Sequence, residues 1–398
     1  MHQFMNEEVT MNRRNFIKLT GLGLGSLALS SSIVGCSGNT ASSDIYGWNG
    51  PNPAEQDIRL KVLSYAILSP NPHNKQPWII NLTGPRSFDL YVDPERLLPA
   101  TDPYYRQIHI GQGTFLETLA IAASGLGHQV RFDYFPQDMY SNTELLHKPV
   151  ASVELVEQPD IAVDPLFDQL LKRHSNKREY DNRSLTADEI NTLQAFHGTQ
   201  NDRPLSLVSG PQAQSSFEKI LTEGMQIEVG DRARDDETIA MFRFDEDEVK
   251  QYRDGFGIAQ AGVSGFKKRL IETFFLSRNS AEADPTDFGE QAVAMTRKTA
   301  ASTATFGWIT STGNSRLDQV KAGHDYCRLN LKTTAMGLAQ HPMSQVLQEY
   351  PAMLPLQAEF KETFGINAQD TVQMLFRLGR AEPTPHGPRR LVSELVQG

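Results

Sequence analysis

The sequence S-P-N-P-H-N-K-Q-P-W, at residues 69–78, is the most informative stretch of this chain. Pro70 and Pro72 fix the backbone φ angle and remove two N–H donors, which predicts a rigid, irregular loop between a helix at 55–68 and a strand at 78–82. Three amide side chains lie on this loop, at Asn71, Asn74 and Gln76. Such a loop suits recognition of a planar heterocycle with donors and acceptors on its edge, and a polar helix-to-strand turn is the alternative.

A second stretch, R-H-S-N-K-R-E-Y-D at residues 173–181, gathers basic and hydrogen-bonding side chains at the end of a helix predicted over 164–173. Arg173 and Lys177 suit phosphate oxygens, because a guanidinium can donate two parallel hydrogen bonds and an ammonium is a mobile point charge. His174 and Ser175 add further hydrogen-bonding groups. In an acidic protein this pattern indicates an anion site, and a solvated basic face is the alternative.

Two other stretches align with each other without gaps. They are G-T-F-L-E-T-L-A-I-A-A-S-G-L-G at 113–127 and G-H-D-Y-C-R-L-N-L-K-T-T-A-M-G at 323–337. Each has the apolar spacing of an amphipathic helix, ends in a glycine suited to a helix C-terminus, and follows a polar segment with one arginine, Arg106 or Arg316. The likeness predicts an internal duplication, and a chance likeness of two amphipathic helices is the alternative.

The rest of the pattern mixes strands and helices, which predicts an α+β or α/β fold with three layers. Short apolar, β-branched runs predict strands at 78–82, 88–92, 130–135, 151–156, 205–208, 306–311 and 372–378. Helical patterns fall at 55–68, 164–173, 187–197, 214–227 and 354–364. The segment from about 214 to 300 is dense in charge and then rich in glycine, and we expect it to be a helical lid inserted over the site, or else a solvated helical arm.

Together with a third stretch, P-R-R-L at 388–391, the first two stretches resemble the three flavin-binding segments of FMN-dependent nitroreductases. In that superfamily the flavin lies at a homodimer interface, with the Arg-Ser-Lys segment from one subunit and the proline-rich loop from the other. Here the loop stands in residues 54–160 and the Arg-Ser-Lys segment in residues 161–398, and each half lacks the other's segment. The resemblance therefore implies a nitroreductase-like three-layer α/β/α fold. Two fused half-repeats would mimic the homodimer in one pseudo-dimeric monomer, as in the tandem branch that includes the Acg-like dormancy proteins.

The resemblance also assigns roles to matching positions. Arg173, Ser175 and Arg390 would contact the phosphate and ribityl groups of FMN, and His174 would be a further cofactor-binding residue. Many relatives have a basic residue two places before the terminal arginine, where this chain has Pro388, and Arg389 is the candidate substitute. Lys177 would lie near flavin N1 and O2 and stabilise the anionic reduced ring, which makes it the candidate catalytic residue. The ring itself would be edged by Pro70, Asn71, Asn74 and Gln76, with Pro342 and Met343 in a segment that approaches N5.

The implied activity is ping-pong electron transfer. A reduced nicotinamide or another donor would pass a hydride to FMN, and the reduced flavin would then reduce a nitroaromatic, a quinone or a similar acceptor. One alternative is a protein that sequesters FMN without turnover. Another is a cofactor-free lipoprotein that mediates contacts, which would leave Arg173, Lys177 and Arg390 without an anionic partner.

Composition argues against several other classes of protein. The net charge of −10 argues against a nucleic-acid partner, because phosphates demand a basic surface. Cys36 and Cys327 are the only cysteines, so neither a disulfide framework nor a cysteine-rich metal site is available. The ten histidines include no H-E-x-x-H pattern, and we expect no bound metal.

Residues 1–36 are expected to be an export signal. The paired Arg13 and Arg14, followed by F-I-K and an apolar run, resemble the signal of the Tat pathway, which carries proteins that are already folded. The run ends I-V-G-C, which resembles a lipobox and predicts lipidation of Cys36. We expect residues 37–53 to be a flexible tether and the mature protein to lie lipid-anchored on the periplasmic or cell-envelope face of a membrane. A Sec signal or an uncleaved anchor is the alternative.

Overall fold

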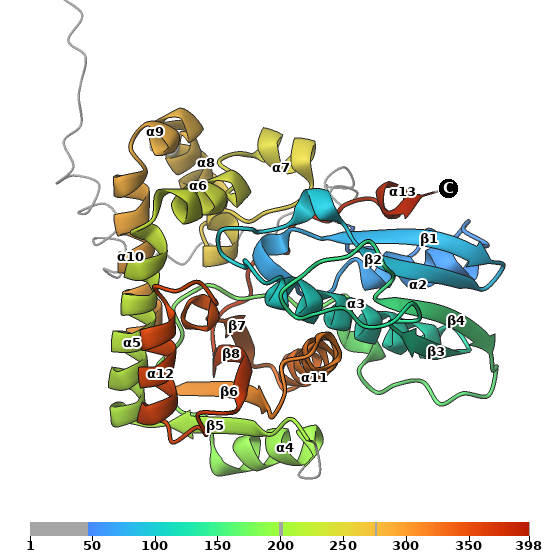
Figure 1. The fold of residues 1–398 in the computed structure, drawn as a ribbon. Helices are drawn as coiled ribbons and strands as arrows, with labels where there is room; N and C mark the ends of the chain where they lie inside the picture. Colours follow the sequence, from blue (N-terminus) through green and yellow to red (C-terminus); the bar gives the residue numbers. More distant parts are fainter. Residues whose placement is uncertain (1–46, 199–201, 275–276, 398) are drawn as a thin grey trace, which may run out of the picture. The chain divides into compact units, whose positions relative to one another are not determined.

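The computed structural model describes residues 47–397 except 199–201 and 275–276. The expected export signal, Cys36 and most of the expected tether lie outside the described residues. Within them the fold is α+β, as the sequence predicts, and it contains two separate sheets with their helices (Figure 1). No helix in the described part of the chain is long and apolar enough to cross a membrane.

The first half of the chain forms one antiparallel sheet. Its elements are α2 (Ile58–Ala66), η1 (Pro72–Asn74), β1 (Trp78–Gly84), β2 (Ser87–Val92), η2 (Pro94–Arg96), α3 (Arg106–Gly125), β3 (His128–Tyr134) and β4 (Ala151–Glu157). The 3₁₀ turn η3 (Phe167–Gln169) lies at the start of the second half. The strands lie in the order β3-β4-β2-β1. Alternate side chains of β2, such as Phe88 and Leu90, are buried against α2 and α3 because strand residues point to opposite faces in turn.

The second half forms another antiparallel sheet, in the order β5-β6-β8-β7. Its elements are α4 (Ala187–His197), β5 (Leu205–Ser209), α5 (Pro211–Val229), α6 (Arg232–Met241), α7 (Glu246–Tyr252), η4 (Ile258–Ala261), α8 (Gly265–Phe274), α9 (Arg278–Ala283), α10 (Pro285–Ala301), β6 (Thr305–Ser311), α11 (Arg316–Ala335), β7 (Ala339–Pro342), η5 (Gln345–Leu347), α12 (Leu354–Thr363) and β8 (Thr371–Gly379). This sheet is a middle layer, with apolar side chains packed against α4 and α11 on one face and against α5 and α12 on the other.

The two halves repeat one topology. The path α2-β1-β2-α3-β3-β4 corresponds to α4-β5-β6-α11-β7-β8, and in each sheet the four strands lie in the order first, second, fourth, third. The halves differ most between their first two strands, where the first half has a turn at residues 85–86 and the second has helices α5 to α10. We call these helices, at residues 211–301, the insertion. At the C-terminus, α13 (Val392–Leu395) leads into β9 (Val396–Gln397), which pairs in parallel with β1 of the first half.

Helices α3 and α11 cross at the two glycines that the sequence alignment places in register. A Cβ atom on Gly113 would lie 1.9 Å from the carbonyl oxygen of Val320, and a Cβ on Gly323 would lie 2.1 Å from that of Ile110. The Cα atom of each glycine would also lie about 3.0 or 2.9 Å from the other's Cβ. Only glycine allows two backbones to approach so closely, so these positions fix the packing of one half on the other.

The arginines that open these two helices make equivalent contacts across the same interface. Both are buried, with 2% exposure for Arg106 and 0% for Arg316. Arg106 donates to backbone carbonyls at residues 347, 372 and 373 of the second half, and Arg316 donates to carbonyls at 104, 141 and 144 of the first. Each half therefore inserts a charged side chain into the other. Backbone carbonyls accept from both guanidiniums, and Glu349 also pairs with Arg106 at 3.2 Å.

One expectation of local structure is wrong, and two short strands were not predicted. Residues 164–173 do not form an α-helix, because Phe167 packs against the end of α3 at Gly125 and only the 3₁₀ turn η3 forms. The strands β7 and β9 are too short to show an apolar pattern and were not predicted. In the described part of the expected tether, the indole N–H of Trp48 donates to the carbonyl of Gly387 at 2.9 Å. This contact, at the end of residues 37–53, ties the segment to the C-terminal region.

Candidate functional site

Segments that lie far apart in the sequence meet around the R-H-S-N-K-R stretch. They are residues 47–50, the loop at 69–77, residues 173–178, the part of the insertion at 253–262, and residues 384–390. We call the first the strap and the fourth the lid segment. Hydrogen bonds join the lid segment to three of the others. The Gln76 side chain donates to the carbonyl of Arg253 at 2.9 Å, and the backbone N–H of Lys177 donates to the carbonyl of Gln260 at 3.0 Å. The Arg253 side chain donates to the carbonyl of Arg389 at 3.0 Å.

The loop at 69–77 has a strained backbone that its own side chains hold in place. His73, Asn74 and Gln76 have positive φ angles of 50°, 53° and 53°, which non-glycine residues seldom adopt. The Asn71 side chain accepts from the backbone N–H of Gln76 at 2.8 Å. Pro70 contributes a carbonyl that accepts from Thr114. Rigidity of this kind is common at ligand sites.

The amide groups of Asn74 and Gln76 bind other parts of the chain. Asn74 accepts from Arg389 at 2.6 Å and donates to the carbonyls of Pro388 and Gly255. Gln76 accepts from the backbone N–H of Arg390 at 2.8 Å. Both residues lie where the segments meet, and their amides attach the loop to the C-terminal segment and the lid segment.

Two buried arginines form the positive centre of the site. Arg173 is 3% exposed and Arg389 is 5% exposed, and both donate to one carbonyl, that of Leu68, at 3.0 and 3.2 Å. Arg173 also donates to Asn330 at 3.2 Å. Burial lowers the pKa of both guanidiniums, and for Arg389 the nearby charge of Arg173 lowers the pKa further. Within the described residues no carboxylate forms an ion pair with either, so two like charges face each other without compensation.

The neighbouring Arg390 points elsewhere. Its guanidinium lies 3.5 Å from the carboxylate of Asp93 and donates to the carbonyl of Gln76 at 2.9 Å. Arg390 thus anchors the C-terminal segment beside β1. The residue beside Arg173 is Arg389, which the sequence comparison had given only as a substitute for the missing basic residue at Pro388.

Lys177 lies under the lid segment. Its ammonium group is 3.8 Å from the ring centre of Phe256, a cation–π contact. Burial, together with the positive charge of Arg377, lowers the pKa of Lys177 to about 8. Burial and the same lysine lower the pKa of His73 to about 4, so His73 is neutral at pH 7.

In the adjoining stretch Ser175 is half-buried, and His174 accepts from the backbone N–H of Thr384 at 3.3 Å.

Met343 does not face the site. Its side chain is buried in the core between the second sheet and α5, and its backbone N–H donates to the carbonyl of Leu375 at 2.9 Å. Pro342, at the end of β7, is half-buried. In this strand His341 contacts a positive group, because its ring accepts from Arg377 at 3.1 Å. Burial and the charges of Arg377 and Lys177 lower the pKa of His341. Strand alternation could not be applied here because β7 was not predicted.

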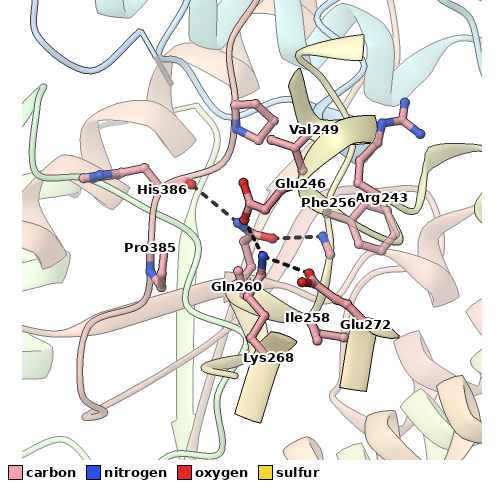
Figure 2. A pocket seen from close by; sticks show the side chains of 13 residues that line it. Arg243, Glu246, Val249, Phe256, Ile258, Gln260, Lys268, Glu272, Pro385 and His386 are labelled. Carbon is pink, nitrogen blue, oxygen red and sulfur yellow. Dashed lines mark hydrogen bonds and ion pairs between the residues drawn. The ribbon is translucent and has the colours of Figure 1, made fainter. Parts of the chain in front are cut away.

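Three aromatic residues of the site carry no sequence signal: Trp48, Phe256 and His386. Each is a single ring in an irregular segment, so no periodicity marks it. Figure 2 shows the cavity that the lid segment forms with residues 385–388, with a volume of about 30 Å³, enough for roughly one water. Lys268 lies there between Glu246 and Glu272, and Gln260 donates to the carbonyl of His386 at 3.5 Å (Figure 2).

Several buried polar atoms around this centre have no hydrogen-bond partner. They are Ser69 Oγ, His73 Nδ1, Arg178 Nε, Thr384 Oγ1, His386 Nε2 and Arg389 Nε. Unpartnered buried polar groups are costly, and their concentration next to uncompensated guanidiniums indicates a binding site for a polar anion. No group of side chains in the described ranges is arranged to hold a metal ion.

Comparison with known proteins gives one consistent likeness. No family model matches the chain. The chain is 26% identical over 362 residues to "Putative NAD(P)H nitroreductase Rv3131" of Mycobacterium tuberculosis H37Rv, and the match covers 87% of this chain and 92% of that one. The counterpart in M. tuberculosis CDC 1551 matches equally. Among solved structures, this chain is similar to a putative nitroreductase from Anabaena variabilis. The identity is 13% and the TM-score is 0.40, and the match covers 74% of this chain and 69% of that chain. It is also similar to the FMN-dependent nitroreductase NfnB of Mycobacterium smegmatis, with 17% identity, a TM-score of 0.35, and coverage of 57% and 94%.

Proposed function

We propose that this chain is an FMN-dependent oxidoreductase of the nitroreductase type. It takes electrons from a reduced nicotinamide and passes them to a small acceptor such as a nitroaromatic or a quinone. The observation that carries the proposal is the pair of buried, uncompensated guanidiniums of Arg173 and Arg389. The Lys177 ammonium, in the same stretch of sequence as Arg173, lies against Phe256 of the lid segment. The likeness to mycobacterial NAD(P)H nitroreductases over most of both chains supports it.

The residues present fit FMN. A phosphate monoester brings negative charge and acceptor oxygens, which suit Arg173 and the unpartnered Nε of Arg389. A ribityl chain brings hydroxyls, which can pair with the unpartnered Oγ1 of Thr384 and with Ser175 beside it. The isoalloxazine ring carries a partial negative charge on its pyrimidine side when reduced, and Lys177 is the cation available for it.

The chain's own part in the reaction is positioning and charge compensation. When bound, FMN supplies the redox chemistry, accepting a hydride equivalent and releasing electrons to the acceptor. Lys177 is protonated below its pKa of about 8 and so holds a positive charge at neutral pH. The Phe256 ring lies against one side of this ammonium at 3.8 Å, and an apolar neighbour strengthens the interaction of the ammonium with a bound anion. The neutral His73 places no second charge there.

We further propose that the single chain replaces a homodimer, as in the tandem branch of the superfamily. The repeated strand order and the crossing of α3 and α11 at Gly113 and Gly323 support this. The loop at 69–77 comes from the first half and the 173–178 segment from the second, so the site lies between the two halves.

A second candidate is a protein that sequesters FMN without turnover. The lid segment favours it, because Phe256 lies over Lys177 and the backbone on both sides of Phe256 is held by Met241 and Arg243. The two functions differ in how fast the reduced holoprotein reoxidises. Oxidation by a quinone or nitroaromatic that is faster than oxidation by air supports the enzyme. If only Phe256→Ala reacts with the added acceptor, the wild-type chain is a store.

The location is a separate proposal that rests on the sequence. We propose that the chain is exported through the Tat translocase and anchored to the cell-envelope face of a membrane by a lipid on Cys36. The twin arginines at Arg13 and Arg14 and the I-V-G-C ending of the apolar run support it.

The first test is the visible absorption spectrum of the purified full-length chain. Flavin bands that persist through gel filtration support the site, and we expect Arg173→Ala to lose them. Arg86→Ala is the matched control, because the Arg86 side chain is half-exposed and its ion pair is with the exposed Glu157 on the first sheet. A wild-type chain that is colourless and does not bind added FMN would refute the function.

A further inference from the structure

The strap at residues 47–50 carries one large side chain into the positive centre of the site. The Trp48 ring stacks on the His386 ring with centroids 4.0 Å apart and an angle of 20° between planes. Its N–H donates to the carbonyl of Gly387 at 2.9 Å. Gly47 has a φ of 66°, and a Cβ there would lie only 3.1 Å from Cβ of Arg389, so the strap lies directly against that arginine. The strap is therefore fixed to the C-terminal segment, far away in the sequence.

The same ring lies beside both buried guanidiniums. The guanidinium carbon of Arg389 is 5.0 Å from the centre of the Trp48 ring, and that of Arg173 is 5.6 Å away. An indole has the most negative ring face among the aromatic side chains and attracts cations. Arg173 and Arg389 also share one carbonyl acceptor at Leu68, so the ring face attracts two cations that already lie close together. Unlike a carboxylate, it leaves both guanidiniums free to bind an anion.

We propose that Trp48 is a positioning residue for the phosphate end of the cofactor. It holds Arg173 and Arg389 side by side through its ring face, and the strap closes that end of the site. This inference rests on the proposed FMN function. It follows that Trp48 determines how strongly the protein prefers FMN to riboflavin, because the two ligands differ only in the phosphate.

The test is to measure dissociation constants for FMN and riboflavin in the full-length chain and in variants of Trp48. Two cation–π contacts correspond to a change of about tenfold in affinity, so we expect Trp48→Ala to weaken FMN binding about tenfold. Riboflavin affinity should stay within about twofold, since the riboflavin part does not meet the arginine pair. Trp48→Leu keeps apolar bulk without a ring face and should behave like Trp48→Ala, whereas Trp48→Phe should restore most of the preference.

The matched control is Tyr91→Ala. Tyr91 forms a similar stack with His147, at 5.3 Å and 24°, on the first sheet away from the site, and its loss should leave both affinities unchanged. If Trp48→Ala weakens FMN and riboflavin equally, or Trp48→Leu matches the wild type, Trp48 has only a packing role and the inference is overturned. A wild-type chain that binds neither flavin overturns the proposed function as well. A wild-type chain that binds FMN and a Trp48→Ala variant that binds it equally overturn only the inference.

Discussion

The substitution Gly113→Ala tests whether the two halves pack as the repeated topology requires. The new Cβ would lie 1.9 Å from the Val320 carbonyl oxygen and 2.7 Å from its carbonyl carbon. Non-bonded carbon and oxygen atoms lie about 3.3 Å apart or more, so α3 and α11 must separate by more than about 1 Å. Both contact atoms belong to backbone, so no side-chain rotation relieves the clash.

The size of the effect follows from two opposing terms. Alanine in place of glycine inside a helix favours folding by about 1 kcal/mol. Overpacking a filled interface costs about 1–3 kcal/mol, and a clash with rigid backbone belongs at or above the upper end. We therefore expect a net loss of about 2 kcal/mol in the free energy of unfolding, which lowers Tm by about 2–3 °C in a chain of this size. FMN affinity should fall too, since the loop at 69–77 and Arg173 come from different halves.

Thermal unfolding followed by circular dichroism, with FMN titrated in parallel, measures both effects. Gly224→Ala is the matched control: Gly224 is also a buried glycine inside a helix, but a Cβ there would meet its nearest neighbour, the Val346 nitrogen, at an ordinary 3.5 Å. Helix propensity alone predicts that both substitutions raise Tm. A Gly113→Ala chain that melts at or above the wild type would refute the close crossing, and with it the reasoning about two fused halves.

Three further predictions concern charge and location. Lys177→Met should weaken FMN binding about tenfold or more. Because burial and Arg377 lower the pKa of Lys177 to about 8, the affinity of the wild-type chain for FMN should fall as pH rises through 8. Lys177→Arg should remove that fall in a fluorescence titration. Burial raises the pKa of Glu228 to about 7 in the folded state, while the unfolded value is near 4.5. The free energy of unfolding should therefore decrease as pH rises from about 4.5 to 7, by up to about 3 kcal/mol, because the folded state holds a neutral acid. Urea unfolding of Glu228→Gln, whose side chain can still accept from Gln348, should show a flatter pH dependence. Finally, Cys36→Ser should abolish incorporation of a labelled fatty acid and release the protein from the membrane fraction, and unchanged labelling would rule out lipidation at Cys36.

Elements whose ends carry local chemistry were predictable from sequence. Helix α4 spans Ala187–His197, the predicted range, because Thr186 and Glu189 form a capping box at its start and Gly198 follows its end. The strand predictions held for the seven longest strands, where apolar and β-branched residues alternate or run together. The duplication was also predictable, since Gly113 and Gly323 must both be glycine for one physical reason and therefore align.

The parts that were missed depend on contacts between distant segments. Arg389 and Arg390 are adjacent, and nothing local indicates that the first joins Arg173 while the second turns to Asp93. The choice is made by the loop at 69–77, which holds the backbone of this segment through the side chains of Asn74 and Gln76. Similarly, no periodicity could place Trp48 or Phe256, because each reaches the site from an irregular segment.

If the chain binds one flavin, as we propose, the insertion gives a physical reason for one site instead of two. Its lid segment bonds to the loop of the first half through Arg253 and Gly255 and to the segment of the second half through Gln260. At the equivalent place the first half has only the turn at residues 85–86, so no second lid segment can form on the other side of the α3–α11 crossing. In a homodimer any insertion occurs twice and must fit both sites. Fusion of the halves removes that requirement, so that one half can supply the rigid loop while the other supplies the cations and the cover.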